Sequence, residues 1–253
     1  MLDGVRLAVV VPARNESRFI VEVVETMPAF VDEVLVIDDA SEDDTAALAR
    51  AAGATVISHE VRRGVGAAIV TGYRAALERG AGAIAVMAGD GQMCPRDLEP
   101  LARPVTRGVA DYSKGDRFRH EDAHVMPRAR YFAGRALSAL TGRAIGWREL
   151  SDSQTGYTVV SAAALRAIEL DRVWTGYGYP NDLLGHLARA GARFSQTPVR
   201  PVYRGEASGL RPWHLAVITA LIGRAYALRW LERASAAQHL TESSTSSPAA
   251  HDT

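Results

Sequence analysis

Residues 7–16 read LAVVVPARNE, and this stretch decides the fold class. Leu7 to Val11 form an uninterrupted apolar run that ends at Pro12. A short strand without polar alternation is typical of a parallel sheet whose two faces are both buried. Similar runs recur at 34–37, 55–58 and 84–87, and segments with apolar residues at helical spacing separate them, at 17–27, 41–53 and 64–80. The pattern predicts an α/β fold, a mostly parallel central sheet with helices on both faces.

The second half of the chain is less regular. We expect strands at 112–118, 157–160 and 199–203, the last at a sheet edge because prolines lie beside it. Helices are predicted at 127–141, 181–190 and 211–234, and Ser41 is predicted to cap the helix that follows the second strand. The expected organisation is one domain over 1–210, an amphipathic C-terminal helix over 211–236, and a disordered tail over 237–253, which is rich in Ser, Thr, Ala and Pro.

The composition argues against several classes of protein. Lys plus Arg and Asp plus Glu both number 29, and this balance argues against a nucleic-acid binder. The single cysteine, Cys94, allows no intrachain disulfide and fits a reducing cytoplasm. The first residues read as a strand rather than a signal peptide, and no run of about 18 apolar residues predicts a membrane span. We therefore expect a cytoplasmic protein, with its oligomeric state left open.

Carboxylates follow two of the predicted strands directly. Asp38 and Asp39 end the second strand, and Asp90 follows the fourth. Ligands of parallel α/β sheets bind outside the carboxyl ends of the strands. The three side chains are therefore expected at one edge, where a metal ion or a ribose could use them. Asp-Asp after a strand is also a common turn and helix-capping pattern, so this pair alone does not define a site.

Five motifs in a fixed order carry a family resemblance. They are PARNE at 12–16, IDDASEDDT at 37–45, AGDGQ at 88–92, KGDR at 114–117 and DSQTGY at 152–157. Together they resemble the motifs of family 2 glycosyltransferases, and within that family those of dolichol- and polyprenyl-phosphate sugar synthases and related bacterial envelope transferases. The resemblance implies the Rossmann-like GT-A fold. It also implies inverting transfer of a sugar from a nucleoside diphosphate, GDP-mannose or a UDP-hexose.

The resemblance also assigns residue roles. It implies a divalent cation, Mg²⁺ or Mn²⁺, bound by the Asp90 carboxylate and the Gln92 amide oxygen, and oxygen ligands suit these ions. In this chain Ala88 stands where the family usually has a carboxylate, which should weaken ribose or metal contacts without abolishing the site. Catalytic roles fall to Asp90, Arg117, Asp152 and Asp182. Contacts to the donor fall to Pro12, Arg14, Glu16, Ile37, Asp38, Asp39, Ala88, Gly89, Asp90, Arg117, Arg130 and Arg204.

The acceptor is open to more than one interpretation. The leading hypothesis is a lipid-linked acceptor, polyprenyl phosphate, used at the inner face of the cell membrane. The alternatives are a saccharide or small-molecule hydroxyl, and a degenerate protein that only binds sugar nucleotides, as Ala88 suggests. Nucleotidylyltransferases and dehydrogenases are disfavoured because no glycine-rich loop follows the first strand.

The C-terminal helix has two interpretations of equal weight. It could lie in a membrane interface, with Trp and Leu opposite Arg, or pack on its own domain or on a second subunit. The apolar side would carry Trp213, Val217, Leu221, Leu228 and Leu231, and the polar side Arg211, His214, Arg229, Glu232 and Arg233. The pair Gly64 and Gly66 and the seven histidines are given no functional role.

Overall fold

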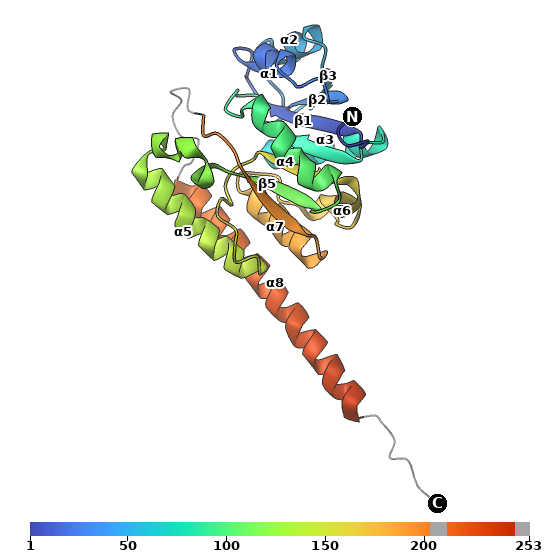
Figure 1. Cartoon of the computed structure of the whole chain (residues 1–253), viewed down its shortest axis with the longest axis vertical. Helices are drawn as coiled ribbons and strands as arrows, with labels where there is room; N and C mark the ends of the chain where they lie inside the picture. Colours follow the sequence, from blue (N-terminus) through green and yellow to red (C-terminus); the bar gives the residue numbers. More distant parts are fainter. Residues whose placement is uncertain (203–211, 246–253) are drawn as a thin grey trace, which may run out of the picture.

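The computed structural model describes residues 1–202 and 212–245, with the backbone alone at 212, 214, 215 and 232–245. Its centre is a seven-stranded sheet in the order β3-β2-β1-β4-β6-β5-β7 (Figure 1). Only β6 runs antiparallel to its neighbours, β4 and β5, whereas the other paired strands are parallel. The strands are β1 Leu7–Ala13, β2 Glu33–Asp38, β3 Thr55–Ser58, β4 Ala83–Val86, β5 Tyr112–Asp116, β6 Thr158–Ser161 and β7 Phe194–Pro198.

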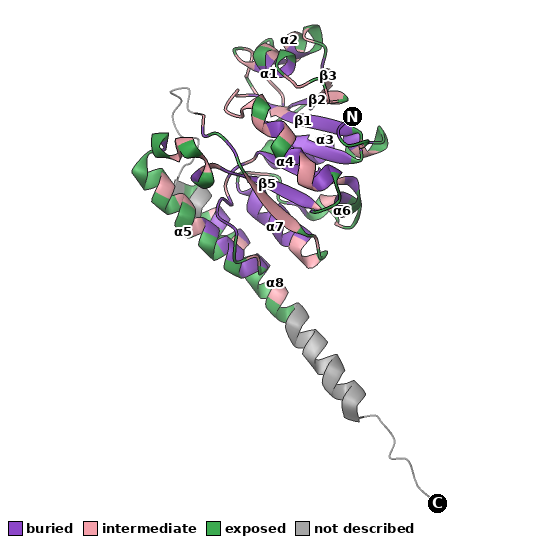
Figure 2. Cartoon of the chain, viewed as in Figure 1, coloured by how far each residue is buried: buried purple, intermediate pink, exposed green. Residues whose placement is uncertain are grey.

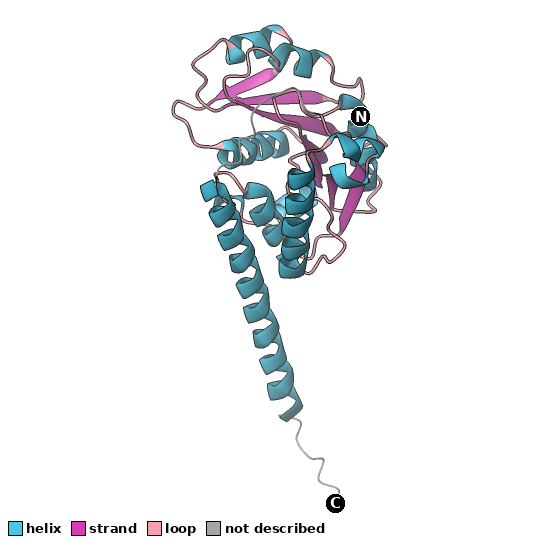
Figure 3. Cartoon of the chain, turned by 90° about the vertical axis from the view of Figure 1, so that its left-hand side faces the viewer, coloured by secondary structure: helices cyan, strands magenta, loops and turns pink. Residues whose placement is uncertain are grey.

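Helices cover both faces of the sheet, as Figure 3 shows. Strand β1 explains why, because its alternate side chains enter two different cores. Val9 packs with α1 and α4 on one face, and Val10 packs with α3 and α7 on the other. Both side chains are fully buried, so a polar residue at either position would lie in a core. The α-helices are α1 Ile20–Glu25, α2 Thr45–Ala51, α3 Val65–Glu78, α4 Leu98–Thr106, α5 Arg128–Ile145, α6 Ala162–Arg166, α7 Tyr179–Arg189 and α8 Pro212–Thr245; the 3₁₀ turns are η1 Pro95–Asp97, η2 Arg117–Arg119, η3 Glu121–Val125 and η4 Leu170–Arg172.

The C-terminal helix α8 packs first on its own domain and then leaves it. Ile218, Leu221 and Ala225 are buried where α8 crosses α5 and α7. Beyond that contact α8 projects away from the sheet (Figure 1). It continues to Thr245, past the predicted end at 236, so part of the predicted tail is helical; residues 246–253 lie outside the described part of the chain. In the part of the chain that is described, no helix is both long and apolar enough to cross a bilayer.

Two local predictions were wrong. The last strand is Phe194–Pro198, not 199–203, because the ring of Phe194 packs edge-on against Tyr112 at 5.9 Å and fixes the register beside β5. Its sequence, FSQTP, lacks the apolar run that indicates a buried strand. Ser41 does not cap α2, which begins at Thr45. The Ser41 hydroxyl instead accepts a hydrogen bond from the Asn15 amide at 3.0 Å.

Candidate functional site

A cleft of about 720 Å³ opens at the carboxyl ends of β1, β2 and β4. The parallel pairing of these strands brings their ends to the same edge: Ala13 lies opposite Asp38, and Gly89 donates a hydrogen bond to the Pro12 carbonyl at 3.2 Å. The cleft is therefore a product of strand order, as expected for an open α/β sheet. Its lining residues are Pro12, Ala13, Arg14, Glu16, Asp39, Arg62, Gly64, Val65, Ala68, Ala88, Gly89, Asp90, Gly176, Tyr177 and Trp213.

The loops after β1 and β2 hold one another in place. The Asn15 side chain accepts from the Glu42 amide at 2.9 Å, and the Glu16 amide donates to the Thr45 hydroxyl at 2.8 Å. Asn15 and Ala40 both have positive φ values, 56° and 57°, which non-glycine residues adopt rarely. These cross-loop hydrogen bonds keep both residues in that conformation and fix the wall of the cleft that carries Arg14 and Glu16.

Asp39 is a buried carboxylate that the chain itself satisfies. It accepts hydrogen bonds from the backbone amides of Arg63 and Gly64, both at 2.8 Å, and from Nδ1 of His59 at 2.9 Å. Burial raises the pKa of Asp39, but the His59 contact and the two amides outweigh it and leave the pKa below its ordinary value. Asp39 therefore stays ionised and ties β2 to the start of α3. Nε2 of His59 lies 3.0 Å from the Thr71 hydroxyl, so this histidine, assigned no role from sequence, links the cleft wall to α3.

Gly64 and Gly66 let a distant segment reach the cleft. A Cβ on Gly66 would lie 2.3 Å from the Trp174 carbonyl oxygen, and one on Gly64 would lie 2.7 Å from the Thr175 carbonyl oxygen. The Thr175 oxygen accepts the Gly66 amide at 2.8 Å. This close approach places Gly176 and Tyr177 on the cleft lining. Sequence analysis missed both, and the glycine pair was the available signal.

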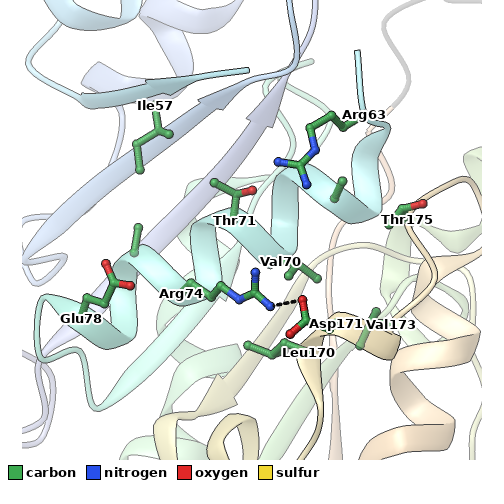
Figure 4. Close-up of a pocket in the computed structure, with 12 residues that line it drawn as sticks. Ile57, Arg63, Val70, Thr71, Arg74, Glu78, Leu170, Asp171, Val173 and Thr175 are labelled. Atoms are coloured by element: carbon green, nitrogen blue, oxygen red, sulfur yellow. Dashed lines mark hydrogen bonds and ion pairs between the residues drawn. The ribbon is translucent and has the colours of Figure 1, made fainter. Parts of the chain in front are cut away.

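The same segment also lines a second pocket, of about 360 Å³, along the side of α3 (Figure 4). Here the Arg74 guanidinium on α3 lies 2.5 Å from the Asp171 carboxylate. Thr71, the partner of His59, lines this pocket as well. Helix α3 and the segment 170–177 therefore separate the two cavities and contribute to both.

Asp90 lies at the turn after β4 and lines the cleft. Its Oδ1 accepts the Gln92 amide at 2.9 Å, and Gly91 between them has a φ of 68°, which favours glycine. Glu16 is the other carboxylate on the described lining besides Asp39, and no described lining residue is His or Cys. Such an oxygen donor set fits a hard cation such as Mg²⁺ or Mn²⁺. No group of three or more His, Cys, Asp or Glu able to hold a metal occurs among the described residues, but a Mg²⁺ site built from one or two carboxylates and substrate phosphates needs none.

Arg117 is held in place by Asp152. Its Nε and Nη2 donate to the two Asp152 oxygens at 2.7 and 3.0 Å, while the amides of Gln154 and Thr155 donate to Oδ1 at 3.1 and 3.2 Å. The Asp152 side chain is fully buried, whereas that of Arg117 is 25% exposed. Burial raises the pKa of Asp152, and Arg117 and Lys114 together bring it below its ordinary value. Asp152 is thus a fixed anion behind a partly exposed guanidinium.

Lys114 lies under this pair and is fully buried on β5. Its ammonium donates to the Thr155 carbonyl at 2.5 Å. Burial lowers the pKa of Lys114 to about 7, against the opposing attraction of Asp152. Lys114 is part of the KGDR motif, but the family resemblance assigns it no role, and only the structure shows that it is buried.

Arg130 and Arg117 both interact electrostatically with Tyr177 on the cleft lining. Burial raises the pKa of the Tyr177 hydroxyl, and the positive charges of Arg130 and Arg117 oppose that rise. Both guanidinium groups therefore act on a residue that lines the cleft, although neither arginine lines it. A smaller pocket of about 160 Å³ adjoins at Tyr177 and is lined also by Met93, Gln154 and Tyr179.

The Asp182 carboxylate, near the start of α7, has partners within its own chain. It accepts the Trp174 amide at 2.8 Å, and Nε2 of His186 and Nη1 of Arg224 lie 3.5 and 3.6 Å away. Burial raises the pKa of Asp182, but His186 and the Trp174 amide hold it below its ordinary value. The carboxylate is buried and is not on the lining of either cavity next to Tyr177.

The structure brings together most of the residues predicted to contact the donor. Ile37 and Asp38 are buried behind the cleft at the end of β2, and Gln92, Arg117 and Arg130 lie outside its lining. Arg204 lies outside the described residues. Residues on the lining that were not predicted from the sequence come from the end of β1, from the loop before α3 and its first turn, from the segment before α7 and from the first turn of α8. On the lining are the predicted residues Pro12, Arg14, Glu16, Asp39, Ala88, Gly89 and Asp90.

The chain is similar to known proteins both in sequence and in fold. The family model described as glycosyl transferase family 2 matches residues 8–167. The chain is 32% identical over 208 residues to an undecaprenyl-phosphate mannosyltransferase of Micrococcus luteus, covering 79% of this chain and 84% of that protein. It is 24% identical over 213 residues to a UDP-N-acetylglucosamine–dolichyl-phosphate N-acetylglucosaminyltransferase of Methanococcus voltae, covering 77% and 84%. The structure of Mycobacterium tuberculosis glucosyl-3-phosphoglycerate synthase with Mn²⁺, UDP-glucose and phosphoglyceric acid matches with a TM-score of 0.64 and 21% identity, over 88% of this chain and 80% of that chain.

The fold and the family model therefore define the class of glycosyltransferases that have the GT-A fold. The chain belongs to glycosyl transferase family 2 and is a glycosyltransferase. The Rossmann-like GT-A fold expected from the sequence is confirmed.

Proposed function

We propose that this glycosyltransferase moves a hexose, with inversion, from GDP-mannose or a UDP-hexose to polyprenyl phosphate at the membrane surface. The names of the two relatives support a polyprenyl or dolichyl phosphate acceptor. The main observation that supports this acceptor is that the Asp182 and Asp152 carboxylates are buried and paired. A hydroxyl acceptor needs a base to remove its proton, whereas a phosphate is already ionised. Both carboxylates are buried in ion pairs with their own chain, which fits an acceptor that needs no base.

The donor diphosphate fits beside Asp90. Asp90 and Gln92 would hold Mg²⁺ or Mn²⁺, which when bound stabilises negative charge on the leaving diphosphate. Arg117, fixed by Asp152, and Arg130 supply further positive charge next to Tyr177. Ala88 removes one carboxylate from the lining, so Asp90 and Glu16 are left as the candidate anionic ligands there.

Asp90→Ala tests the proposal most directly. We expect turnover to fall at least about a hundredfold, the scale seen when a main stabiliser of transition-state charge is lost. EDTA should have a similar effect, and added Mn²⁺ or Mg²⁺ should restore the wild type but not the variant. The assay is transfer from radiolabelled GDP-mannose and a panel of UDP-hexoses to undecaprenyl phosphate in detergent. Full transfer in EDTA would exclude the metal-dependent mechanism.

A soluble hydroxyl acceptor is the second candidate, because one of the solved structures that match is a complex with both UDP-glucose and phosphoglyceric acid. The same donor panel offered with sugars and small hydroxy acids decides between them. Transfer to these and none to undecaprenyl phosphate would favour this alternative. Binding of donor without transfer to any acceptor would instead favour the degenerate binder.

A further inference from the structure

Helices α5 and α8 form a surface with an unusual charge pattern. They lie side by side along part of their length (Figure 1). Residues 127–148 contain arginines at 128, 130, 135, 143 and 148 and no Asp or Glu, and Glu149 follows them. Residues 212–231 also lack Asp and Glu; they contain Arg229 and Arg224, and Arg224 faces the buried Asp182. The whole chain has a formal net charge of zero, so this surface concentrates positive charge. An anionic partner is therefore favoured there over a neutral one.

Three of these arginines line one pocket of about 700 Å³ between the two helices. Arg143 and Arg148 come from the end of α5 and the turn after it, and Arg229 comes from α8 beside Tyr226. Arg229 donates to the Arg143 carbonyl at 3.1 Å and so holds its charge at the carboxyl end of α5. None of the described residues that line the pocket is acidic. Guanidinium groups gathered in this way suit a phosphate group.

The same two helices carry exposed apolar side chains, and one of them, Tyr226, lines the pocket. Phe132 and Leu140 on α5 and Tyr226 and Trp230 on α8 are each more than half exposed. Leu140 adjoins the pocket residue Ala139, and Trp230 lies one helical turn from Tyr226 on the same side of α8. Figure 2 shows the exposed side of α5 along the outer surface of the molecule. A free phosphate would make no use of apolar neighbours, whereas a bilayer presents phosphates above hydrocarbon, and Trp and Tyr favour that boundary.

We propose that the α5–α8 surface binds the headgroups of an anionic phospholipid membrane, with Arg143 and Arg148 on the phosphates and Leu140 and Trp230 in the acyl boundary. Helix α8 begins at Pro212, and its second residue, Trp213, lines the donor cleft, so one helix connects the cleft with this surface. The inference deepens the proposed function, since it names what holds the enzyme beside a lipid acceptor. The site is separate from the donor cleft, because the two share no lining residue.

The test is flotation of the full chain with vesicles that contain neither donor nor acceptor. We expect binding to phosphatidylcholine vesicles that include phosphatidylglycerol, and weak binding to phosphatidylcholine alone. Each arginine near an anionic surface contributes about fivefold in affinity, so Arg143→Gln with Arg148→Gln should weaken binding about thirtyfold. The matched control is Arg50→Gln with Arg166→Gln, two exposed arginines on α2 and α6 with the same change in charge, which should stay within about twofold of the wild type.

Two further arms sharpen the outcome. Trp230→Ala should weaken binding while leaving the dependence on phosphatidylglycerol, and inorganic phosphate added at constant ionic strength should not release the chain. Equal loss in both double variants, equal binding to the two kinds of vesicle, or release by inorganic phosphate would overturn the proposal. So would a stable dimer in solution that the Arg143 and Arg148 changes dissociate, with no binding to vesicles. Transfer to undecaprenyl phosphate in detergent is measured separately, so failure of vesicle binding would leave the proposed reaction standing.

Discussion

Replacing Asp152 with Asn separates a positioning role from that of a base. In the structure Asp152 is fully buried and accepts two hydrogen bonds from the Arg117 side chain and others from backbone amides. Asn keeps the shape but removes the charge, and its NH₂ group would face the Arg117 guanidinium. Breaking a buried ion pair by removing one partner costs about 3–5 kcal/mol. Because the Arg117 side chain is 25% exposed, we expect the lower end, about 3 kcal/mol.

The assay is thermal unfolding combined with kinetics. For a chain of this size about 3 kcal/mol corresponds to a Tm lower by roughly 6–12 °C. The control is Asp171→Asn, which breaks the Arg74 pair at the surface, where Asp171 is 86% exposed; such pairs contribute about 1 kcal/mol or less. In transfer assays kcat should fall for Asp152→Asn, since Arg117 is no longer fixed, while the shape of the pH profile stays that of the wild type.

Two results would refute this reasoning. A Tm for Asp152→Asn no lower than that of Asp171→Asn would show that the buried pair contributes no more than a surface pair. Loss of the acid limb of the kcat profile would show that Asp152 takes a proton during the reaction, and the positioning role would be wrong.

Three further predictions concern other parts of the site. Burial lowers the pKa of Lys114 from its ordinary 10.5 to about 7. The unfolded chain therefore binds this proton more tightly than the folded chain does. The free energy of unfolding should rise between about pH 7 and 10.5, by up to about 5 kcal/mol. Lys114→Met should remove that rise. The prediction is wrong if the free energy of unfolding, measured with urea, changes with pH in the same way in the variant and in the wild type. Asp182→Asn should keep kcat within about threefold at saturating polyprenyl phosphate, because a phosphate acceptor needs no base, and a kcat loss above about a hundredfold in an intact fold would point to a hydroxyl acceptor. Gly66→Ala should raise the KM for donor and cost about 1–3 kcal/mol of stability, because its Cβ would lie 2.3 Å from the Trp174 carbonyl oxygen. The control is Gly223→Ala, which has open space around the new Cβ and should change neither quantity. Equal KM values for the two variants would show that the segment before α7 does not shape the donor cleft.

The first half of the chain was predictable because its strands are buried on both faces. Leu7 to Val11 and the run at 34–37 have no polar residue, so their sequence alone indicates parallel strands. Parallel strands of known order bring their carboxyl ends together, which is why Asp39 and Asp90 could be placed on one cleft from the sequence.

The second half could not be predicted in the same way, because polar residues occupy buried strands. Strand β5 reads YSKGD and is buried throughout. Lys114 donates to the Thr155 carbonyl and Asp116 accepts from the Ser151 hydroxyl, and both of these partners are far away in sequence. No local pattern announces those partners. Likewise Tyr177 and Trp213 reach the cleft through the packing of α3, α7 and α8, and only the positions of whole helices place them there.

The hydrogen bonds between the loops after β1 and β2 also set a limit on protein engineering. A designer who wished to alter donor choice would first exchange residues around Asp39. Such a graft would leave the amides of Asn15 and Glu16 without the Ser41 and Thr45 hydroxyls that now accept them. The Glu16 amide is partly buried, and a buried amide left unpaired costs about 1–3 kcal/mol. The two loops therefore form one exchangeable cassette, and successful chimeras with other members of the family should carry residues 12–17 and 38–45 from the same parent.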